Sequence, residues 1–269
     1  MKARAVILLM VSLMLCVFTS CGTINKENLK KLKTKEYKNY TLFYENILPE
    51  MQIKDYDIIT DNMYSYLTGK LGLSFVKPHF NLAVLPIEND VVQFQKRNTN
   101  ACTDYETIYL IDMFNLSEEM YEKYGDPPEG IANNAFTHEL AHLMTHGVIE
   151  YNGRNKLRPE EMNATALAFI DFTASEFNLL YDLSEIITNN FSKEQYGKLQ
   201  ELGIASLKNA SEGREPAVFL LYLYMHEEYD KVMNFLEAND LDDFIGKANW
   251  SAEDDKWFME WINMHYNGF

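Results

Sequence analysis

The pattern of the sequence changes at one stretch, Thr137-His138-Glu139-Leu140-Ala141-His142-Leu143. Short runs of β-branched and aromatic residues, typical of strands, precede it. After it, apolar residues recur almost everywhere with helical spacing. The stretch itself is expected on a helix over residues 127–146, because Asp126 can cap the start of that helix and Gly147 is a natural stop.

The expected elements form two blocks. Strands are predicted over 40–44, 80–85 and 107–111, with an amphipathic helix over 53–71. The later helices are predicted over 159–178, 181–190, 193–208, 215–238 and 251–265. A small sheet followed by a mostly helical lobe is an α+β fold, expected as one domain over residues 39–269.

The composition limits the partners and the ligands. The chain has 269 residues, of which 47% are hydrophobic, so it can form a substantial core. Its net charge of -16 argues against nucleic acid or anionic lipid as the main partner. The 3 cysteines lack the paired spacing of a disulfide framework or a thiolate zinc site. Any metal must therefore be held by histidine and carboxylate.

The N-terminus has the order of an export signal. Lys2 and Arg4 precede an apolar run over 6–18, which is short for a membrane span of about 20 residues. Phe18-Thr19-Ser20-Cys21 resembles the lipobox of bacterial lipoproteins, in which the signal, here 1–20, is cut off and the cysteine is acylated. The alternative is an N-terminal anchor helix.

The lipobox resemblance implies an exported protein held to a bacterial membrane through Cys21, on the periplasmic side or at the cell surface. Residues 21–38, which are rich in lysine, are expected to form a tether outside the fold. Cys102 would then be the only free thiol, expected as a small buried apolar residue.

The two histidines have the spacing of a metal site. Residues four apart lie one turn apart on one face of a helix, so His138 and His142 can both reach an ion at about 2.0 to 2.1 Å. The alternative is a helix with two polar surface histidines. The apolar neighbours Leu140, Ala141 and Leu143 favour a buried helix and therefore the metal site.

A catalytic zinc needs a third protein ligand. A metzincin site is excluded, because Thr145 and Val148 stand where its glycine and third histidine would be. His146 lies about 12 Å from His138 along a straight helix, too far to share the ion. It is expected to be a polar residue in the last turn.

The next helix offers two carboxylates, Glu160 and Glu161. Glu161 shares its face with Ala164, Thr165 and Ala168, small residues that allow a second helix to approach closely. Glu160 lies on a face with larger side chains. We therefore favour Glu161 as the third ligand over Glu160.

His138-Glu139-x-x-His142 followed by Glu161-x-x-Ala164 resembles the gluzincin branch of the zinc metallopeptidases, in the peptidase MA-like superfamily. Thr165 stands where that motif often has Asp or Asn. The resemblance covers about residues 38–265 and implies a zincin-like fold, with a small N-terminal mixed sheet and an active-site helix before the helical lobe.

The resemblance also implies roles. Zn²⁺ held by His138, His142 and Glu161 would activate a water, and Glu139 would act as the general base that takes its proton. The residue that stabilises the transition state stays open among four candidates: Tyr222, Tyr224, His226 and Arg214. For the tyrosines, core packing is the alternative role. The strand over 107–111 is a candidate edge for pairing with an extended substrate.

These observations predict a lipid-anchored zinc metallopeptidase acting on proteins or peptides. The alternative is a non-catalytic cell-envelope lipoprotein that keeps a peptidase-like fold and binds a protein or peptide. The intact Glu139 speaks against this alternative, because binding alone needs no general base. Zinc-dependent hydrolysis of a non-peptide amide would use the same residues.

Overall fold

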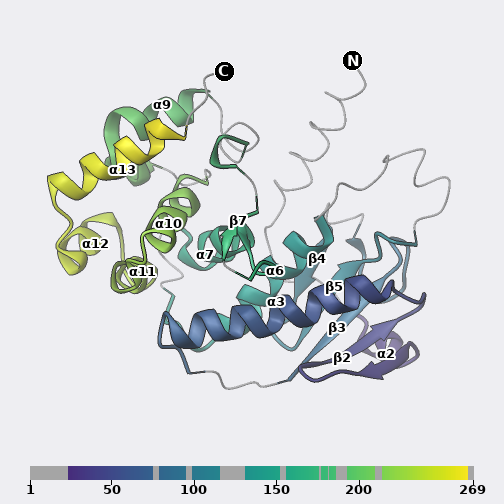
Figure 1. Ribbon diagram of the computed structural model, residues 1–269. Coiled ribbons are helices and arrows are strands. Elements are labelled where there is room, and N and C mark those ends of the chain that lie inside the picture. The colour runs from purple at the N-terminus through teal and green to yellow at the C-terminus, as the bar shows by residue number, and fades with distance from the viewer. Residues whose placement is uncertain are drawn as a thin grey trace, which may run out of the picture. The chain divides into compact units, whose positions relative to one another are not determined.

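The structure is a computed structural model (Figure 1). It describes residues 24–74, 79–94, 99–115, 131–151, 156–175, 177–180, 182–185, 193–209 and 214–265. The chain divides into two compact units. Unit 1 is formed within Met1–Tyr64 and Phe75–His146, and unit 2 within Ser65–Ser74 and Gly147–Phe269.

Unit 1 contains a five-stranded mixed sheet with the strand order β1-β2-β3-β5-β4. Its strands are β1 (Lys33–Glu36), β2 (Tyr40–Tyr44), β3 (Phe80–Leu85), β4 (Ala101–Thr103) and β5 (Thr107–Ile111). The three central strands β2, β3 and β5 are parallel, and both edge strands pair antiparallel. The three strands expected from the sequence are confirmed with the same bounds. The expectation that 107–111 forms an edge is wrong, because β5 lies between β3 and β4.

Within unit 1, one aromatic contact joins two helices. The ring of Phe136 on α6 (Ile131–Thr145) lies 4.5 Å from that of Tyr56 on α3 (Glu50–Gly69). Phe136 also lies 6.5 Å from Phe80 of β3. On the same face of the sheet, Leu82 pairs with Ile108 and both are fully buried. The α3 and α6 helices cover the ranges expected from the sequence to within a few residues at each end, and the predicted cap at Asp126 lies outside the described residues.

The opposite face of the sheet is covered by the segment expected to be a tether. It contains α2 (Lys26–Leu29) and β1, and β1 pairs with β2. The side chain of Leu29 is buried in a cluster with Ala83 and Tyr109, and Asn25 N–H donates to the Val91 carbonyl at 3.0 Å. Part of 21–38 therefore belongs to the fold. The predicted signal 1–20 and Cys21 lie outside the described residues.

Cys102 of β4 differs from its expected state. Its side chain is buried, as the sequence indicated, but it is disulfide-bonded. It is therefore not the free thiol that the cysteine count led us to expect.

Unit 2 is mostly helical, as predicted. It contains α7 (Pro159–Ala168), β6 (Ile170–Asp171), β7 (Asn178–Leu179), α9 (Lys193–Leu202), the 3-10 helix η1 (Gly203–Asn209), α10 (Glu215–Met225), α11 (Tyr229–Leu236), α12 (Leu241–Ala248) and α13 (Ala252–Met264). The α10 helix is apolar nearly all round, and its Phe219 makes edge-on contacts with Phe235, Phe244, Trp250 and Phe258. This aromatic cluster is the core of the helical unit.

Several helix ends of unit 2 differ from the sequence-based expectation. The helix predicted over 159–178 ends at Ala168, and the chain enters the short β6–β7 ribbon. The helix predicted over 215–238 is two helices, separated where Glu227 adopts a φ of 56°. The α12 helix was not expected. Most of the predicted helix 181–190 lies outside the described residues. Among the described helices, none is long and apolar enough to cross a membrane.

One glycine provides a sharp test of the packing in unit 2. Gly203 has a φ of 53°, and a Cβ at this position would collide with the Asp255 carboxylate, which accepts from Ile204 N–H at 2.9 Å. We expect Gly203→Ala to lower the free energy of unfolding by more than about 2 kcal/mol. The matched control is Gly197→Ala in α9, where nothing lies within 4 Å. There we expect a gain of about 0.5 to 1 kcal/mol.

Urea unfolding followed by tryptophan fluorescence measures both variants. The 3 tryptophans, Trp250, Trp257 and Trp261, all belong to unit 2, so the signal reports on the unit that contains both glycines. Equal stability of the two variants would contradict this description of the α9–η1 junction.

Candidate metal centre

The predicted pair of histidines lies on α6 with its imidazoles facing one another. The Nε2 atoms of His138 and His142 are 3.2 Å apart, and their ring centroids are 4.8 Å apart at an angle of 72°. Both side chains are buried, at 9% and 8% exposure. The alternative of two polar surface histidines is therefore wrong.

The spacing of the two nitrogens matches what one metal ion requires. Two ligands at 2.0 to 2.1 Å from a tetrahedral zinc lie about 3.3 to 3.4 Å from one another. The separation of 3.2 Å between the two Nε2 atoms is close to that value. A hydrogen bond between a protonated and an unprotonated ring nitrogen would also give this distance. The pair thus fits a metal without movement of the backbone.

The sheet and α3 hold α6 in place. The helix packs on β4 and β5, and its residues Leu140 and Ala141 are fully buried. At its other end, Asn133 accepts a hydrogen bond from Gln52 Nε2 at 2.6 Å and donates to Asp55 at 3.1 Å, both on α3. The histidines are thus carried by a helix fixed along its length, which favours a preformed site.

Glu139 is the third polar residue of the motif, and only 4% of it is exposed. Burying a carboxylate costs free energy unless a hydrogen bond, an opposite charge or a metal ion compensates for the lost water. Glu139 directly follows His138 on α6 and so belongs to the same helical turn.

His146 lies outside the pair, as expected. Its backbone N–H donates to the His142 carbonyl at 3.0 Å, in the last turn of the helix. Its ring is exposed and stacks on Tyr105, with centroids 3.7 Å apart. Tyr105 adopts a φ of 63°, which is uncommon for a residue other than glycine. This contact assigns His146 to packing at the end of α6.

Glu161 lies on α7, which belongs to unit 2. Its backbone carbonyl accepts from Thr165 Oγ1 at 2.9 Å, and its side chain is half-buried. Glu160 is half-buried as well, so burial does not separate the two carboxylates. The face assigned to Glu161 from the sequence is small and buried, with Ala164 at 1% and Ala168 at 4% exposure.

Two arginines of unit 2 interact electrostatically with the Glu161 carboxylate. Burial lowers the pKa of Arg158, which directly precedes α7, and the negative charge of Glu161 opposes this effect. The pKa of Arg214, which directly precedes α10, is also lowered by burial, and Glu161 again opposes the shift. The Glu161 side of α7 is therefore an electropositive environment suited to a carboxylate.

A buried hydrogen-bond network joins α7 to α10. Asn163 is fully buried, donates to Tyr151 Oη at 3.0 Å and accepts from Tyr224 Oη. No role was expected for Asn163 from the sequence. A polar amide between apolar Met162 and Ala164 was the available signal.

The four candidates for transition-state stabilisation have different surroundings. Tyr222 packs against the rings of Phe258 and Trp261, and Tyr224 is engaged with Asn163. His226 lies on Tyr222 with ring centroids 4.5 Å apart, and burial lowers its pKa. Arg214 is the candidate whose charge interacts with Glu161.

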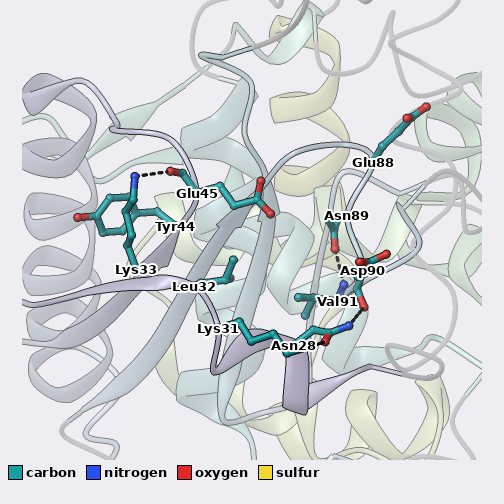
Figure 2. Close-up of a pocket in the computed structure, with 10 residues that line it drawn as sticks. All are labelled: Asn28, Lys31, Leu32, Lys33, Tyr44, Glu45, Glu88, Asn89, Asp90 and Val91. Atoms are coloured by element: carbon teal, nitrogen blue, oxygen red, sulfur yellow. Dashed lines mark hydrogen bonds between the residues drawn. The ribbon is translucent and has the colours of Figure 1, made fainter.

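A cavity of about 670 Å³ in unit 1 is separate from the predicted site (Figure 2). It is lined by the segment from α2 to β1, the end of β2 and residues 88–91. None of the site residues predicted from the sequence lines it.

No protein-family model matches the chain, and no curated protein matches it.

The histidine pair yields a prediction on metal content. We expect the purified chain to hold about one zinc, and His142→Ala to lose most of it, because one imidazole and a carboxylate hold zinc weakly. His146→Ala is the control and should keep the metal, because its ring stacks on Tyr105. Elemental mass spectrometry measures the zinc. Equal zinc in all three proteins would refute the site.

Proposed function

We propose that the chain is a zinc-dependent metallopeptidase with a zincin-like, gluzincin-type catalytic domain, which hydrolyses peptide bonds in proteins or peptides. One observation carries the proposal. Two buried imidazole nitrogens lie 3.2 Å apart on successive turns of α6, next to a buried Glu139. This combination has the donor spacing and the adjacent base that metal-assisted hydrolysis requires.

The proposed ligands are His138, His142 and Glu161. Two imidazoles and one carboxylate are a donor set that could hold a metal ion. Such a set is typical of catalytic zinc, which keeps one position open for water. The field of Arg158 and Arg214 supports an ionised Glu161, because positive charge favours the charged form of a carboxylate.

Zinc bound by these residues would lower the pKa of a water towards about 7 and polarise the substrate carbonyl. Glu139 would take the proton of the attacking water and deliver it to the leaving amine. Its burial on α6 fixes the position of the carboxylate before the substrate arrives.

Arg214 is our choice for stabilising the negative charge that develops on the carbonyl oxygen. It keeps a permanent charge, whereas Tyr222 is packed among aromatic rings and Tyr224 is hydrogen-bonded to Asn163. The edge strand β4 replaces β5 as the candidate for pairing with an extended substrate, because a strand edge must be open to accept a partner.

We also propose that the protein is exported and held at a bacterial membrane through an acylated Cys21. The sequence of residues 1–21 supports this proposal. Acylation of Cys21 excludes this cysteine from the disulfide of Cys102, and cleavage after residue 20 removes Cys16, so in the acylated protein Cys102 would be a free thiol.

The general base gives the main test of the function. Glu139→Gln should lower peptide turnover by a factor of about 10² to 10⁴, because the amide cannot accept the proton. Zinc content should stay unchanged, since Glu139 is not a ligand in this proposal. Release of peptides from an unfolded protein substrate, followed by mass spectrometry, measures turnover. Activity that survives the change would sink the mechanism, and zinc binding without any turnover in the unaltered chain would favour the binding lipoprotein.

The third ligand is tested by two neighbouring carboxylates. Glu161→Ala should weaken zinc binding by a factor of about 10 to 100 or more, because it removes a ligand, whereas Glu160→Ala should change it little. Competition with a chromogenic chelator measures the affinity. The reverse ranking would show that Glu160, and not Glu161, faces the metal.

A further inference from the structure

Three polar side chains of unit 2 are joined through one amide on α7. Asn163 donates from Nδ2 to Tyr151 Oη at 3.0 Å, and its Oδ1 accepts from Tyr224 Oη. Asn163 is fully buried, and Tyr224 is 3% exposed. We call Tyr151, Asn163 and Tyr224 the Asn163 network. All three residues belong to unit 2, as does Glu161.

The network connects α7 to a partner whose own position is fixed. Tyr224 stands on α10, whose residues Glu215–Tyr224 are buried, and its ring lies 6.0 Å from that of Tyr66. Burial raises the pKa of Tyr224, so its hydroxyl keeps its proton and donates to the amide oxygen of Asn163. The hydrogen bonds therefore tie the position of α7 to that of α10.

Apolar packing alone defines the rotation of α7 weakly. Ala164, Ala166 and Ala168 are buried, with exposures of 1%, 0% and 4%. Residues two apart point about 200° from one another around a helix, so these small side chains face more than one side of α7. They allow close approach but form shallow ridges that interlock little with a neighbour. Met162 and Leu167 are the larger buried apolar side chains of the helix.

The position of the Glu161 carboxylate depends on this rotation. An atom about 5 to 6 Å from the helix axis moves by about 1 Å when the helix turns by about 10°. A metal ligand must lie within about 0.2 Å of its ideal distance. Glu160 and Glu161 are about 100° apart around the helix, so a larger turn would exchange one carboxylate for the other. The bonds of Asn163 would not survive such a turn, because a hydrogen bond weakens steeply away from its preferred distance and angle.

We propose that Asn163 and Tyr224 are positioning residues, which fix the rotation of α7 and thereby the direction of the Glu161 carboxylate. The inference rests on the proposed function, in which Glu161 is the third zinc ligand. Asn163 follows Glu161 by two residues and so acts from nearly the opposite side of the helix. A buried asparagine that selects one arrangement of packed helices, at some cost in stability, is an established use of a buried polar group.

Tyr224→Phe tests the network with little change in shape. It removes one hydroxyl, keeps the ring, and should weaken zinc binding by about tenfold, measured by competition with a chromogenic chelator. The matched control is Tyr196→Phe, which removes the hydroxyl of another buried tyrosine of unit 2, donated to the Ile262 carbonyl at 3.4 Å. The control should leave the zinc affinity unchanged. Equal zinc affinity in the two variants overturns the proposal.

A second variant separates positioning from general stability. Asn163→Leu/Tyr224→Phe replaces both bonded groups by apolar ones, a change that is often nearly neutral for stability. We expect the midpoint of urea unfolding to stay close to that of the unaltered chain, whereas zinc binding weakens by a factor of about 10 to 100. A variant that keeps both its midpoint and its zinc affinity overturns the proposal.

A double-mutant cycle shows whether the network acts through the ligand. In a chain that already carries Glu161→Ala, Tyr224→Phe should cause no further loss of zinc affinity, because the carboxylate that it positions is gone. A further loss as large as in the unaltered chain would mean that the network supports the fold in general, and it overturns the proposal. The cycle decides the question even where a variant lowers the unfolding midpoint.

The same measurements separate this inference from the proposed function. If the unaltered chain binds no zinc, or if Glu161→Ala binds it as tightly as the unaltered chain, the proposed metal centre fails and the positioning role fails with it. If Glu161→Ala loses zinc affinity and Tyr224→Phe keeps it, the positioning inference alone fails.

Discussion

The burial of three polar side chains on α6 is the constraint on which the site depends. His138, Glu139 and His142 are each less than about one-tenth exposed. Removing such groups from water costs several kcal/mol unless they gain interactions of similar strength. Their burial on a helix therefore indicates that hydrogen bonds, opposite charges or a bound metal replace the lost water. A metal ion satisfies both imidazoles at once, and the 3.2 Å between their Nε2 atoms suits it.

The rest of unit 1 keeps that helix in place. Parallel strands β3 and β5 provide a rigid base, and α6 packs against β5 and its antiparallel neighbour β4. The hydrogen bonds of Asn133 tie the first half of α6 to α3. The same sheet also carries β1, so the lysine-rich segment before it belongs to the same compact unit as the proposed catalytic helix.

In unit 2, the Glu161-x-x-Ala164 motif is held in place by contacts between residues that are distant in sequence. Asn163 on α7 and Tyr224 on α10 are bonded across 61 residues, and Arg214 enters the field of Glu161 from the start of α10. The aromatic cluster around Phe219 fixes α10 itself. The carboxylate that we propose as the third ligand thus depends on the core of the helical unit.

Local patterns in the sequence determined the three central strands and the histidine pair. Short β-branched and aromatic runs bounded by turn residues favour strands, and a spacing of four places two side chains on one helical face irrespective of the fold. Tertiary structure alone decided that the lysine-rich 33–36 is a strand, that β5 is not an edge, and that the long predicted helices end at Ala168 and Met225. It also decided the Asn163–Tyr224 bond. The physical reason is that strand pairing, helix ends and buried polar partners are set by residues distant along the chain, which no local period encodes.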